Sequence, residues 1–334
     1  MKAGIRVLFG IIGSLAIINN SLLLVVIFRN RALLKTPYNR LVLSLAITDL
    51  ITGIGIFVTP SYIIGPDSIT VSSGGFGQFF CRVIYSQYLV FTLGIVSVYT
   101  VACMAMDRWL AVVRPTKYKT ILTKSRVNIC VLCVWMLSVL LNAPHLMEIT
   151  ATSDSDRKEQ CLWIVLTGGT TRRVVAFLEF VGKFFLPLLV AAVTLVSIYN
   201  HVKSSPALFQ TNRGKAGLRL LRMCLLTAVI LGVSWFPNQL YYLLFKYDIT
   251  RMDTPLHHFT VFMCMFNSCV NPLIYCLSNK MYRRYFTLLL CPWHRARVTE
   301  MEMTACDSVS RANEIRPTQT IGPSAASVTN MAIA

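Results

Sequence analysis

The sequence predicts an all-α membrane protein, a bundle of seven transmembrane helices. Of its residues 55% are hydrophobic and 14% are charged, and the mean hydropathy is +0.59. Soluble domains carry about 25% charged residues, so this chain cannot cover itself with a solvated surface. Seven apolar segments are long enough to cross a bilayer core, which needs about 20 residues. They are predicted to be helices, because a helix satisfies its own backbone hydrogen bonds in lipid.

Five of the seven segments carry no formal charge. The second contains Asp49, and the fifth contains Glu179 and Lys183. The predicted spans are Val7–Phe28, Leu41–Ile64, Val83–Met106, Val127–Met147, Val174–Val202, Met223–Phe245 and Pro255–Asn279. Together they make a predicted bundle domain over residues 1–279.

Positive charge is unevenly distributed among the loops. The net charge is +18, and lysine and arginine concentrate in the first, third and fifth loops and in the C-terminal tail. Positive loops stay on the cytoplasmic side, so the N-terminus is predicted to be extracellular and the C-terminus cytoplasmic. Clusters of this kind beside apolar spans indicate contact with anionic membrane lipid rather than with nucleic acid. We therefore expect a multi-pass protein of the plasma membrane.

The chain after the seventh span has two parts. Residues 280–291 predict a short amphipathic helix on the membrane surface, with Tyr282 and Phe286 on the face toward lipid. Cys291 follows and is a candidate for palmitoylation. Residues 292–334 are polar and predict a disordered cytoplasmic tail. Phosphorylation of its serines and threonines by a receptor kinase would add charge and create a docking site for arrestin.

Asp49 is the most unusual residue of the second span. A charge near the centre of a bilayer costs roughly 2.5–3.5 kcal/mol even on the lenient insertion scales, so it needs polar partners. Polar residues predicted at similar depth are Asn20, Ser97, Asn267, Ser268 and Asn271. Their oxygens suit a small hard cation, but an ordinary hydrogen-bonded network explains the same residues.

Three further motifs lie in predicted spans. They are Asp107-Arg108-Trp109 at the end of the third, Trp235-Phe236-Pro237 in the sixth and Asn271-Pro272-Leu273-Ile274-Tyr275 in the seventh. Taken alone, the first is equally well an ion pair at the membrane interface. Each proline removes a backbone hydrogen bond and kinks its helix. Together with Asn20, Leu45, Asp49, Trp135 and Pro187 in the other spans, they resemble the rhodopsin-like (class A) G-protein-coupled receptors, and most closely the neuropeptide receptors.

The resemblance extends from about Asn20 to Cys291 and implies a role for each motif. Asp107, Arg108 and Tyr275 would form the switch that meets the heterotrimeric G protein. Trp235, Pro237, Asn271 and Pro272 would relay activation through the bundle. The polar set Asp49, Ser97, Asn267, Ser268 and Asn271 matches the family's allosteric sodium site, and the resemblance implies no other cofactor. Cys81 and Cys161 match its disulfide.

Two departures from the family pattern carry expectations. Cys81 is two residues farther from Arg108 than is usual, which predicts a bulge at the start of the third span. The segment around Gly217 offers no acid to pair with Arg108 in the resting state. Basal signalling is therefore expected to be raised, or the activation relay to be built differently.

The ligand class is narrowed by two absences. The outer half of the third span has no Asp to pair with an amine, and the seventh span has no Lys to bind retinal. Candidate ligand contacts are Gln87, Tyr88, Glu179, Lys183, Asn238, Gln239, Tyr242 and His257. Glu179 and Lys183 lie four residues apart on one helix face and can pair. Either this pair only neutralises itself, or a charged ligand competes for one partner.

The function favoured by the sequence is that of a receptor for an extracellular ligand, a short peptide, that activates G proteins. A receptor for a non-amine small molecule or lipid is the first alternative, and a constitutively active receptor without a ligand is the second. A transporter would show internal repeats or matched broken helices, and the chain shows neither. No metal-protease spacing of histidines or paired carboxylates indicates an enzyme.

Overall fold

The computed structural model describes residues 3–64, 71, 74–154, 157–164, 169–206 and 212–291. Residues up to Phe286 form one compact unit, and the chain from Thr287 onward forms another. The predicted tail, residues 292–334, lies outside the described residues.

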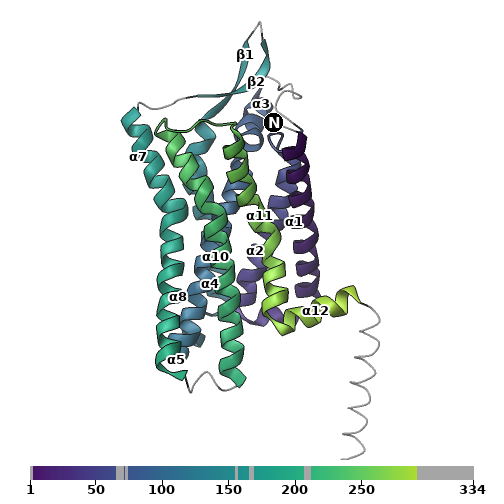
Figure 1. Cartoon of the computed structure of the whole chain (residues 1–334), viewed down its shortest axis with the longest axis vertical. Coiled ribbons are helices and arrows are strands. Elements are labelled where there is room, and N and C mark those ends of the chain that lie inside the picture. The colour runs from purple at the N-terminus through teal and green to yellow at the C-terminus, as the bar shows by residue number, and fades with distance from the viewer. Residues whose placement is uncertain are drawn as a thin grey trace, which may run out of the picture. The chain divides into compact units, whose positions relative to one another are not determined.

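Seven helices among the described residues are long and apolar enough to cross a membrane, which confirms the predicted bundle (Figure 1). They are α1 (Ala3–Arg29), α2 (Pro37–Val58), α4 (Tyr88–Val113), α6 (Lys124–Asn142), the pair α7 (Gly169–Phe180) and α8 (Leu186–Ser204), α10 (Asn212–Lys246) and α11 (Pro255–Ser278). A π-helical turn, η5 (Val181–Phe185), joins α7 to α8, and a 3-10 turn, η4 (Ala143–Met147), extends α6. Shorter helices are η1 (Arg31–Lys35), α3 (Gly75–Phe79), α5 (Pro115–Ile121) and α12 (Lys280–Leu290).

The starts of three spans carry ordinary capping signals. Helices α2 and α11 begin with Pro37 and Pro255, whose missing N–H costs nothing at a first position. The hydroxyls of Thr36 and Thr254 precede them and accept from the backbone N–H of Asn39, at 3.4 Å, and of His257, at 3.1 Å. Thr123 caps α6 in the same way. The sequence thus fixes these helix starts locally.

The second span is shorter than predicted. It was expected to reach Ile64, but α2 ends at Val58 and Thr59 is already extended. Pro60 explains this end, because a proline disfavours helical geometry in the residue before it. The prediction from hydropathy alone did not take account of Pro60, because the proline lies inside an apolar run.

The predicted bulge before the third span is confirmed. Phe80–Tyr85 form a π-helical turn, η3, and Gln87 has a positive φ of 66°, in the left-handed region. The helix α4 therefore starts at Tyr88 rather than at the predicted Val83. The break changes the direction in which residues around Gln87 point.

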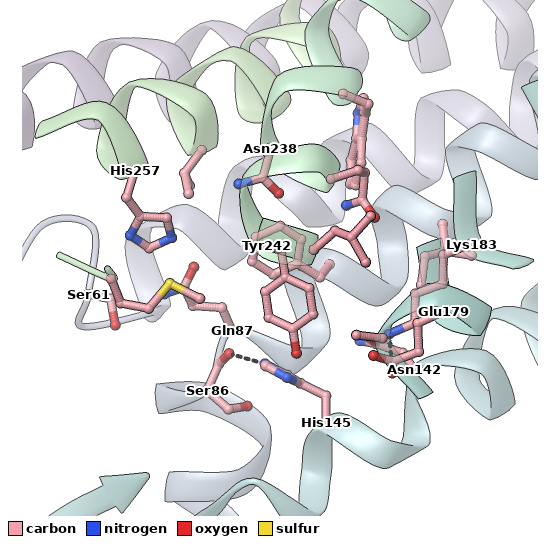
Figure 2. Close-up of a pocket in the computed structure, with 18 of the residues that line it drawn as sticks. Ser61, Ser86, Gln87, Asn142, His145, Glu179, Lys183, Asn238, Tyr242 and His257 are labelled. Carbon is pink, nitrogen blue, oxygen red and sulfur yellow. Dashed lines mark hydrogen bonds and ion pairs between the residues drawn. The ribbon is translucent and has the colours of Figure 1, made fainter. Parts of the chain in front are cut away.

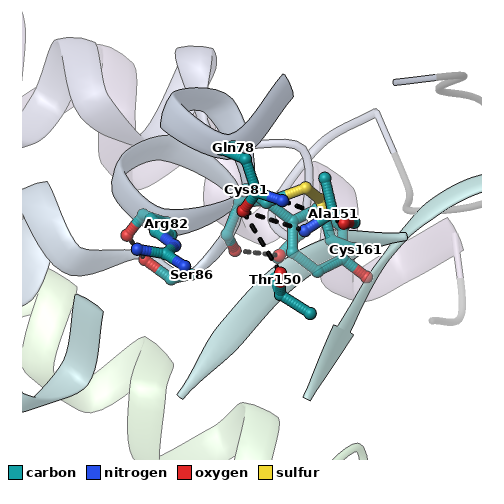
Figure 3. The surroundings of a disulfide bond; sticks show 9 residues. Gln78, Cys81, Arg82, Ser86, Thr150, Ala151 and Cys161 are labelled. Atoms are coloured by element: carbon teal, nitrogen blue, oxygen red, sulfur yellow. Dashed lines mark hydrogen bonds between the residues drawn. A yellow bond between two sulfur atoms is a disulfide. The ribbon is translucent and has the colours of Figure 1, made fainter. Parts of the chain in front are cut away.

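An antiparallel β-hairpin, which was not predicted, lies in a loop of the otherwise helical bundle. Strand β1 (Ile149–Asp154) pairs with β2 (Arg157–Trp163), with Cys161 opposite Ala151. The predicted disulfide between Cys81 and Cys161 is present and ties the hairpin to the π-helical turn η3 (Figure 3). The amide of Gln78 adds hydrogen bonds to Thr150 and to the backbone of Ala151. We call this end of the bundle the hairpin end, and the end with Asp107 and Arg108 the switch end.

Helix α4 is the central element of the bundle, with the largest buried share of the seven spans. It packs against α2, α6, α8 and α10. Polar side chains connect the neighbouring helices: Asn20 donates to Ser268 O at 2.8 Å, and Trp135 donates to the hydroxyl of Ser44 at 3.3 Å. These bonds fix the relative register of α1, α2, α6 and α11.

Two residues of the predicted surface helix, Tyr282 and Phe286, are buried in the protein instead of facing lipid. Tyr282 was expected to face lipid, but its side chain is fully buried and donates to Asn39 Oδ1 at 2.9 Å. Its ring lies 5.9 Å from that of Tyr275 at the end of α11. The first turn of α12 is therefore fastened to the switch end of the bundle.

Candidate functional site

A cavity of about 350 Å³ opens among the helices at the hairpin end. Seven of the eight predicted contact residues line it: Gln87, Glu179, Lys183, Asn238, Gln239, Tyr242 and His257. Glu179 and Lys183 lie on one side, and Ser61 and His257 on the opposite side (Figure 2). Its volume is within the range typical of small-ligand pockets.

Tyr88 does not line this cavity. Its hydroxyl donates to Val139 O of α6 at 3.1 Å, and its ring is buried. The left-handed Gln87 immediately before it turns the start of α4, so that Gln87 takes the position facing the cavity. The amide oxygen of Gln87 accepts from the hydroxyl of Tyr62 at 2.7 Å.

The predicted pairing of Glu179 with Lys183 is confirmed. Nζ of Lys183 lies 2.8 Å from Glu179 Oε1 and also donates to Asn142 Oδ1 at 3.0 Å. The amide nitrogen of Asn142 in turn donates to Tyr88 O and to the hydroxyl of Thr92. Both charged side chains are about 10% exposed, so each depends on its partner rather than on water.

A second charged cluster, behind the cavity wall formed by His145 and Tyr242, is not predicted by the sequence. Glu148, just after η4, forms an ion pair with Lys246 of α10 and accepts from the hydroxyl of Tyr242 at 3.1 Å. Its other neighbour is His145, whose Nδ1 lies 3.1 Å from the carboxylate and whose Nε2 lies 2.9 Å from Ser86 O. Glu148 thus joins the end of α6 to α10, and through His145 to the segment before α4.

The electrostatic balance at Glu148 favours the charged form. Burial raises the pKa of this carboxyl, but the hydrogen bond and charge of His145 and the charge of Lys246 outweigh it and lower the pKa to about 2. In the sequence, Glu148 and Lys246 appear only as charges at the ends of two spans that are 98 residues apart. No local pattern shows that these two ends meet.

Trp235 lines the deep part of the cavity and is nearly buried. Its indole lies directly over Gly94 of α4, where any Cβ would overlap the ring. The ring of Phe91 meets it edge to face, with centroids 6.3 Å apart. Pro237 lies two residues further along α10, inside the helix. A displacement of the indole would therefore act on both α4 and the kinked part of α10.

The predicted polar set lies together in the middle of the bundle. Asn271 Nδ2 donates to Asp49 Oδ2 at 2.7 Å, and the hydroxyls of Ser97 and Ser268 face the same carboxylate. Oδ1 of Asp49 still lacks a hydrogen-bond partner of ordinary geometry, as do the amide oxygens of Asn267 and Asn271. Buried oxygens in this number without donors are unusual and fit a cation.

At the switch end, Arg108 is enclosed by its own neighbours. Nε donates to Asp107 Oδ2 at 2.8 Å, and the guanidinium lies 4.6 Å from the ring centre of Tyr38. The hydroxyl of Tyr118 donates to Asp107 Oδ1 at 3.1 Å; burial, followed by the Asp107 charge, raises the pKa of Tyr118 to about 12. Tyr275 lies fully buried on α11. Arg108 therefore has partners although α10 offers it no acid.

A bundle of seven spans with a cavity at one end and an enclosed arginine at the other is the architecture of a membrane receptor. The model of the rhodopsin family of seven-transmembrane receptors matches residues 19–275. The chain belongs to this family, the class A G-protein-coupled receptors, whose members are receptors rather than enzymes.

Individual relatives are distant but cover most of the chain. An allatostatin-A receptor of Bombyx mori is 25% identical over 86% of this chain and 80% of its own length. Galanin receptor 2a of Danio rerio is 24% identical over 95% of this chain and 83% of its own. A Gq-coupled rhodopsin of Mizuhopecten yessoensis is 26% identical over 84% of this chain, which spans 58% of that rhodopsin.

We predict that Gly94→Ala displaces Trp235. The added methyl group would overlap the indole, and such overpacking costs about 1–3 kcal/mol. The variant should melt at a lower temperature in detergent and show a raised basal signal, because the resting position of Trp235 is disfavoured. Gly232→Ala is the matched control, since its Cβ would meet Leu188 at ordinary contact distance and the gain in helix propensity is the same. Equal stability of the two variants would contradict the prediction.

We also predict that Glu148→Gln lowers the free energy of unfolding at neutral pH by up to about 3 kcal/mol. This follows from the fall of the Glu148 pKa from 4.5 to about 2. The stabilisation is complete above pH 4.5 and disappears as the pH falls toward 2, so the difference from the native chain should narrow over that window. Thermal melting of detergent-solubilised protein measures it.

Asp248→Asn serves as the control for Glu148→Gln. Asp248 also pairs with arginine, but its side chain is 61% exposed. A surface pair of this kind contributes about 0–1 kcal/mol. If both substitutions destabilise the protein equally, the cluster around Glu148 has no special role.

Proposed function

We propose that this chain is a plasma-membrane receptor that binds an extracellular peptide in the cavity at the hairpin end and activates heterotrimeric G proteins. The observation that supports it most is the cavity itself, which combines Trp235 in its deep part with the buried ion pair of Glu179 and Lys183 on its wall. Relatives named as allatostatin-A and galanin receptors, which are peptide receptors, share the bundle over most of its length.

The shape of the cavity suits one end of a peptide. About 350 Å³ is enough for a few side chains but not for a folded ligand. Its wall includes Trp163 of the hairpin and Asp253 of the α10–α11 connection, so it continues from the bundle to the loops. A peptide could place its terminal residues beside Trp235 while the rest of its chain contacts the loops. A compact lipid or small molecule, the alternative ligand class, would use the deep part alone.

Charged groups of the ligand would compete with the ion pairs. Glu179 and Lys183, which line the cavity, pair with each other and are each about 10% exposed; Glu148 and Lys246 pair behind Tyr242. An anionic group of the ligand would bind Lys183, and a cationic group would bind Glu179. Either would replace one buried interaction with another, which gives selectivity against ligands that lack the charge.

Signalling would link the cavity to Arg108. Helix α4 runs from Tyr88 beside the cavity to the switch end, so one rigid element connects both sites. We infer that ligand contact near Trp235 moves α10 about Pro237, and that Arg108 then leaves Asp107 and Tyr118 to bind the G protein. Arrestin and a receptor kinase would act at the same face and tail. The N-terminus would be extracellular and the C-terminus cytoplasmic.

The polar set around Asp49 would hold a sodium ion. Asp49, Ser97, Asn267, Ser268 and Asn271 supply oxygen atoms, and three of these oxygens lack a donor. Sodium would supply the positive charge that the buried carboxylate lacks. The residues would hold α2, α4 and α11 in the resting arrangement around that charge.

Membrane contacts complete the proposal. Helix α12 carries basic residues on one face and apolar residues on the other, as surface helices do. Cys291 is exposed directly after it and is the proposed palmitoylation site. The basic loops at the switch end would attract anionic lipid.

A constitutively active receptor is the second candidate. No Asp or Glu occurs between Lys203 and Tyr247, so α10 cannot contribute an acid that holds Arg108 at rest. Among the described residues, the contacts that enclose Arg108 are made by Asp107, Tyr118 and Tyr38. If these contacts are insufficient, the receptor would signal without a ligand.

The first test is a panel of short peptides applied to cells that express the full chain, with second messengers as the readout. A response should require Arg108, and Arg108→Ala should abolish it at equal surface expression. Glu179→Gln should shift the half-maximal peptide concentration by about tenfold, since bonds to a buried charge contribute about 1.5–3 kcal/mol. The direction of the shift identifies the ligand charge: lower potency indicates a cationic group and higher potency an anionic one.

Phe177→Leu is the control for that experiment, because Phe177 lies on the exposed side of α7. A Glu179→Gln potency within twofold of this control would show that the ion pair does not meet the ligand. A high basal signal that depends on Arg108, with no active peptide, would favour the constitutive receptor. Absence of any signal that depends on Arg108 would overturn the proposed function.

The sodium site is tested by thermal melting in sodium chloride against an equal concentration of choline chloride. Sodium should stabilise the native chain by about 1.4 kcal/mol when its concentration is about ten times its Kd. Asp49→Asn should lose this difference. Asp107→Asn, which changes the other buried carboxylate of α2 and α4, should keep it. The same melting temperature in both salts would rule the site out.

A further inference from the structure

Two cysteine side chains meet where α4 and α6 cross. Sγ of Cys103 lies 3.6 Å from Sγ of Cys130, although the residues are 27 positions apart in the sequence. Both side chains are half-buried, and both lie inside the membrane-spanning segments. The distance is that of a thiol–thiol contact rather than a covalent bond.

Polar bonds on both sides of Cys130 fix its position. One turn or less before it, Asn128 accepts from Arg40 of α2 at 2.7 Å. After it, Trp135 donates to Ser44, also on α2, at 3.3 Å. Helix α4 is packed against α2 as well, so α4 and α6 share one support. The packing of both helices against α2 therefore places the two sulfur atoms next to each other.

The geometry is close to that of a disulfide. A disulfide bond is about 2.0 Å long, so each sulfur would need to move by about 0.8 Å. Rotation of the two side chains about χ1 is the motion that would bring the sulfur atoms together. Among the described free cysteines, Cys264 and Cys269 instead lie against backbone carbonyls of Ser234 and Ile12.

We propose that Cys103 and Cys130 are an oxidation site that forms a disulfide within the bundle when a hydroperoxide reaches it. One thiol attacks the peroxide O–O bond and becomes a sulfenic acid, and the peroxide leaves as an alcohol or as water. The second thiol then attacks the sulfenic sulfur, the S–S bond forms, and water is released. The two cysteines lose two electrons and two protons in total, and the hydroperoxide is the oxidant.

The position of the bridge connects it to the switch end. Cys103 lies one helical turn before Asp107 on α4. Helix α6 is among the least buried of the seven spans, whereas α4 is the most buried. A disulfide would join the two helices covalently beside the residues that enclose Arg108. Thiol exchange with a cellular dithiol would reverse it.

The experiment uses the purified full chain in phosphatidylcholine nanodiscs treated with cumene hydroperoxide. Remaining thiols are then alkylated, and peptides are mapped by mass spectrometry. Cys103 and Cys130 should lose alkylation together, and their peptides should be joined by a bond that dithiothreitol breaks. Cys133, exposed on α6 only three residues away, should remain alkylated. The variant Cys133→Ser should behave as the native chain.

Two variants separate a bridge from independent oxidation. In Cys103→Ser, no joined peptide should form, and Cys130 should be recovered as the alkylated thiol or as a sulfenic acid that dimedone traps. In Cys130→Ser, no joined peptide should form either, and Cys103 is the cysteine that remains to be recovered. Oxidation of Cys103 and Cys130 in the native chain without a joined peptide would overturn the proposal, as would a bond between Cys130 and Cys133.

A measurement on the native chain covers the case in which a variant does not fold. An aryl arsenoxide bonds to both sulfurs of a close thiol pair, and it needs no oxidant. One arsenic group should join the Cys103 and Cys130 peptides. Arsenic bound to neither cysteine, together with no disulfide after hydroperoxide, would show that the two thiols only pack together.

Discussion

The structure depends on one constraint: a polar group inside a bilayer has no water to bond and must find a partner within the protein. Asp49 shows the consequence most clearly, because its carboxylate accepts from Asn271 and so connects α2 to α11. Asn20 connects α1 to the same helix through Ser268. Each of these hydrogen bonds stabilises the fold more than an equivalent bond at a solvated surface, because without it a buried polar group would have no partner. Hydrogen bonds between buried polar side chains therefore fix the helices relative to one another, and apolar side chains pack between these polar positions.

The same constraint shapes the cavity at the hairpin end. Glu179 and Lys183 pair on its wall, and Glu148 and Lys246 pair behind its lining residues His145 and Tyr242; all four side chains are largely buried. Removal of one partner would leave the other charge uncompensated, which is far more costly than removal of both. A ligand can enter only by offering a substitute interaction or by leaving both pairs intact. In the proposed receptor, Glu179 and Lys183 would therefore contribute both to the stability of the cavity and to its selectivity.

Features that depend on local sequence could be predicted, and those that depend on distant helix ends could not. The spans follow from hydropathy, and the Glu179–Lys183 pair from four-residue spacing. The shifted position of Cys81 predicted the bulge before α4, but not that the left-handed Gln87 turns Tyr88 away from the cavity. The hairpin was missed because membrane hydropathy carries no information on loops. The meeting of Glu148 with Lys246 depends on how α6 and α10 are arranged, which neither segment encodes alone.

The enclosure of Arg108 shows how a missing residue can be compensated. Since α10 carries no acid, the resting state cannot be held by a bond between α4 and α10, and the partners of Arg108 come from α4, α5 and α2. Movement of α10 therefore breaks no ion pair at Arg108. Contacts that would resist the proposed movement are those of Trp235 with Gly94 and of Lys246 with Glu148. In the proposed receptor, control of activation would thereby lie at the hairpin end of α10, where Trp235 lines the cavity.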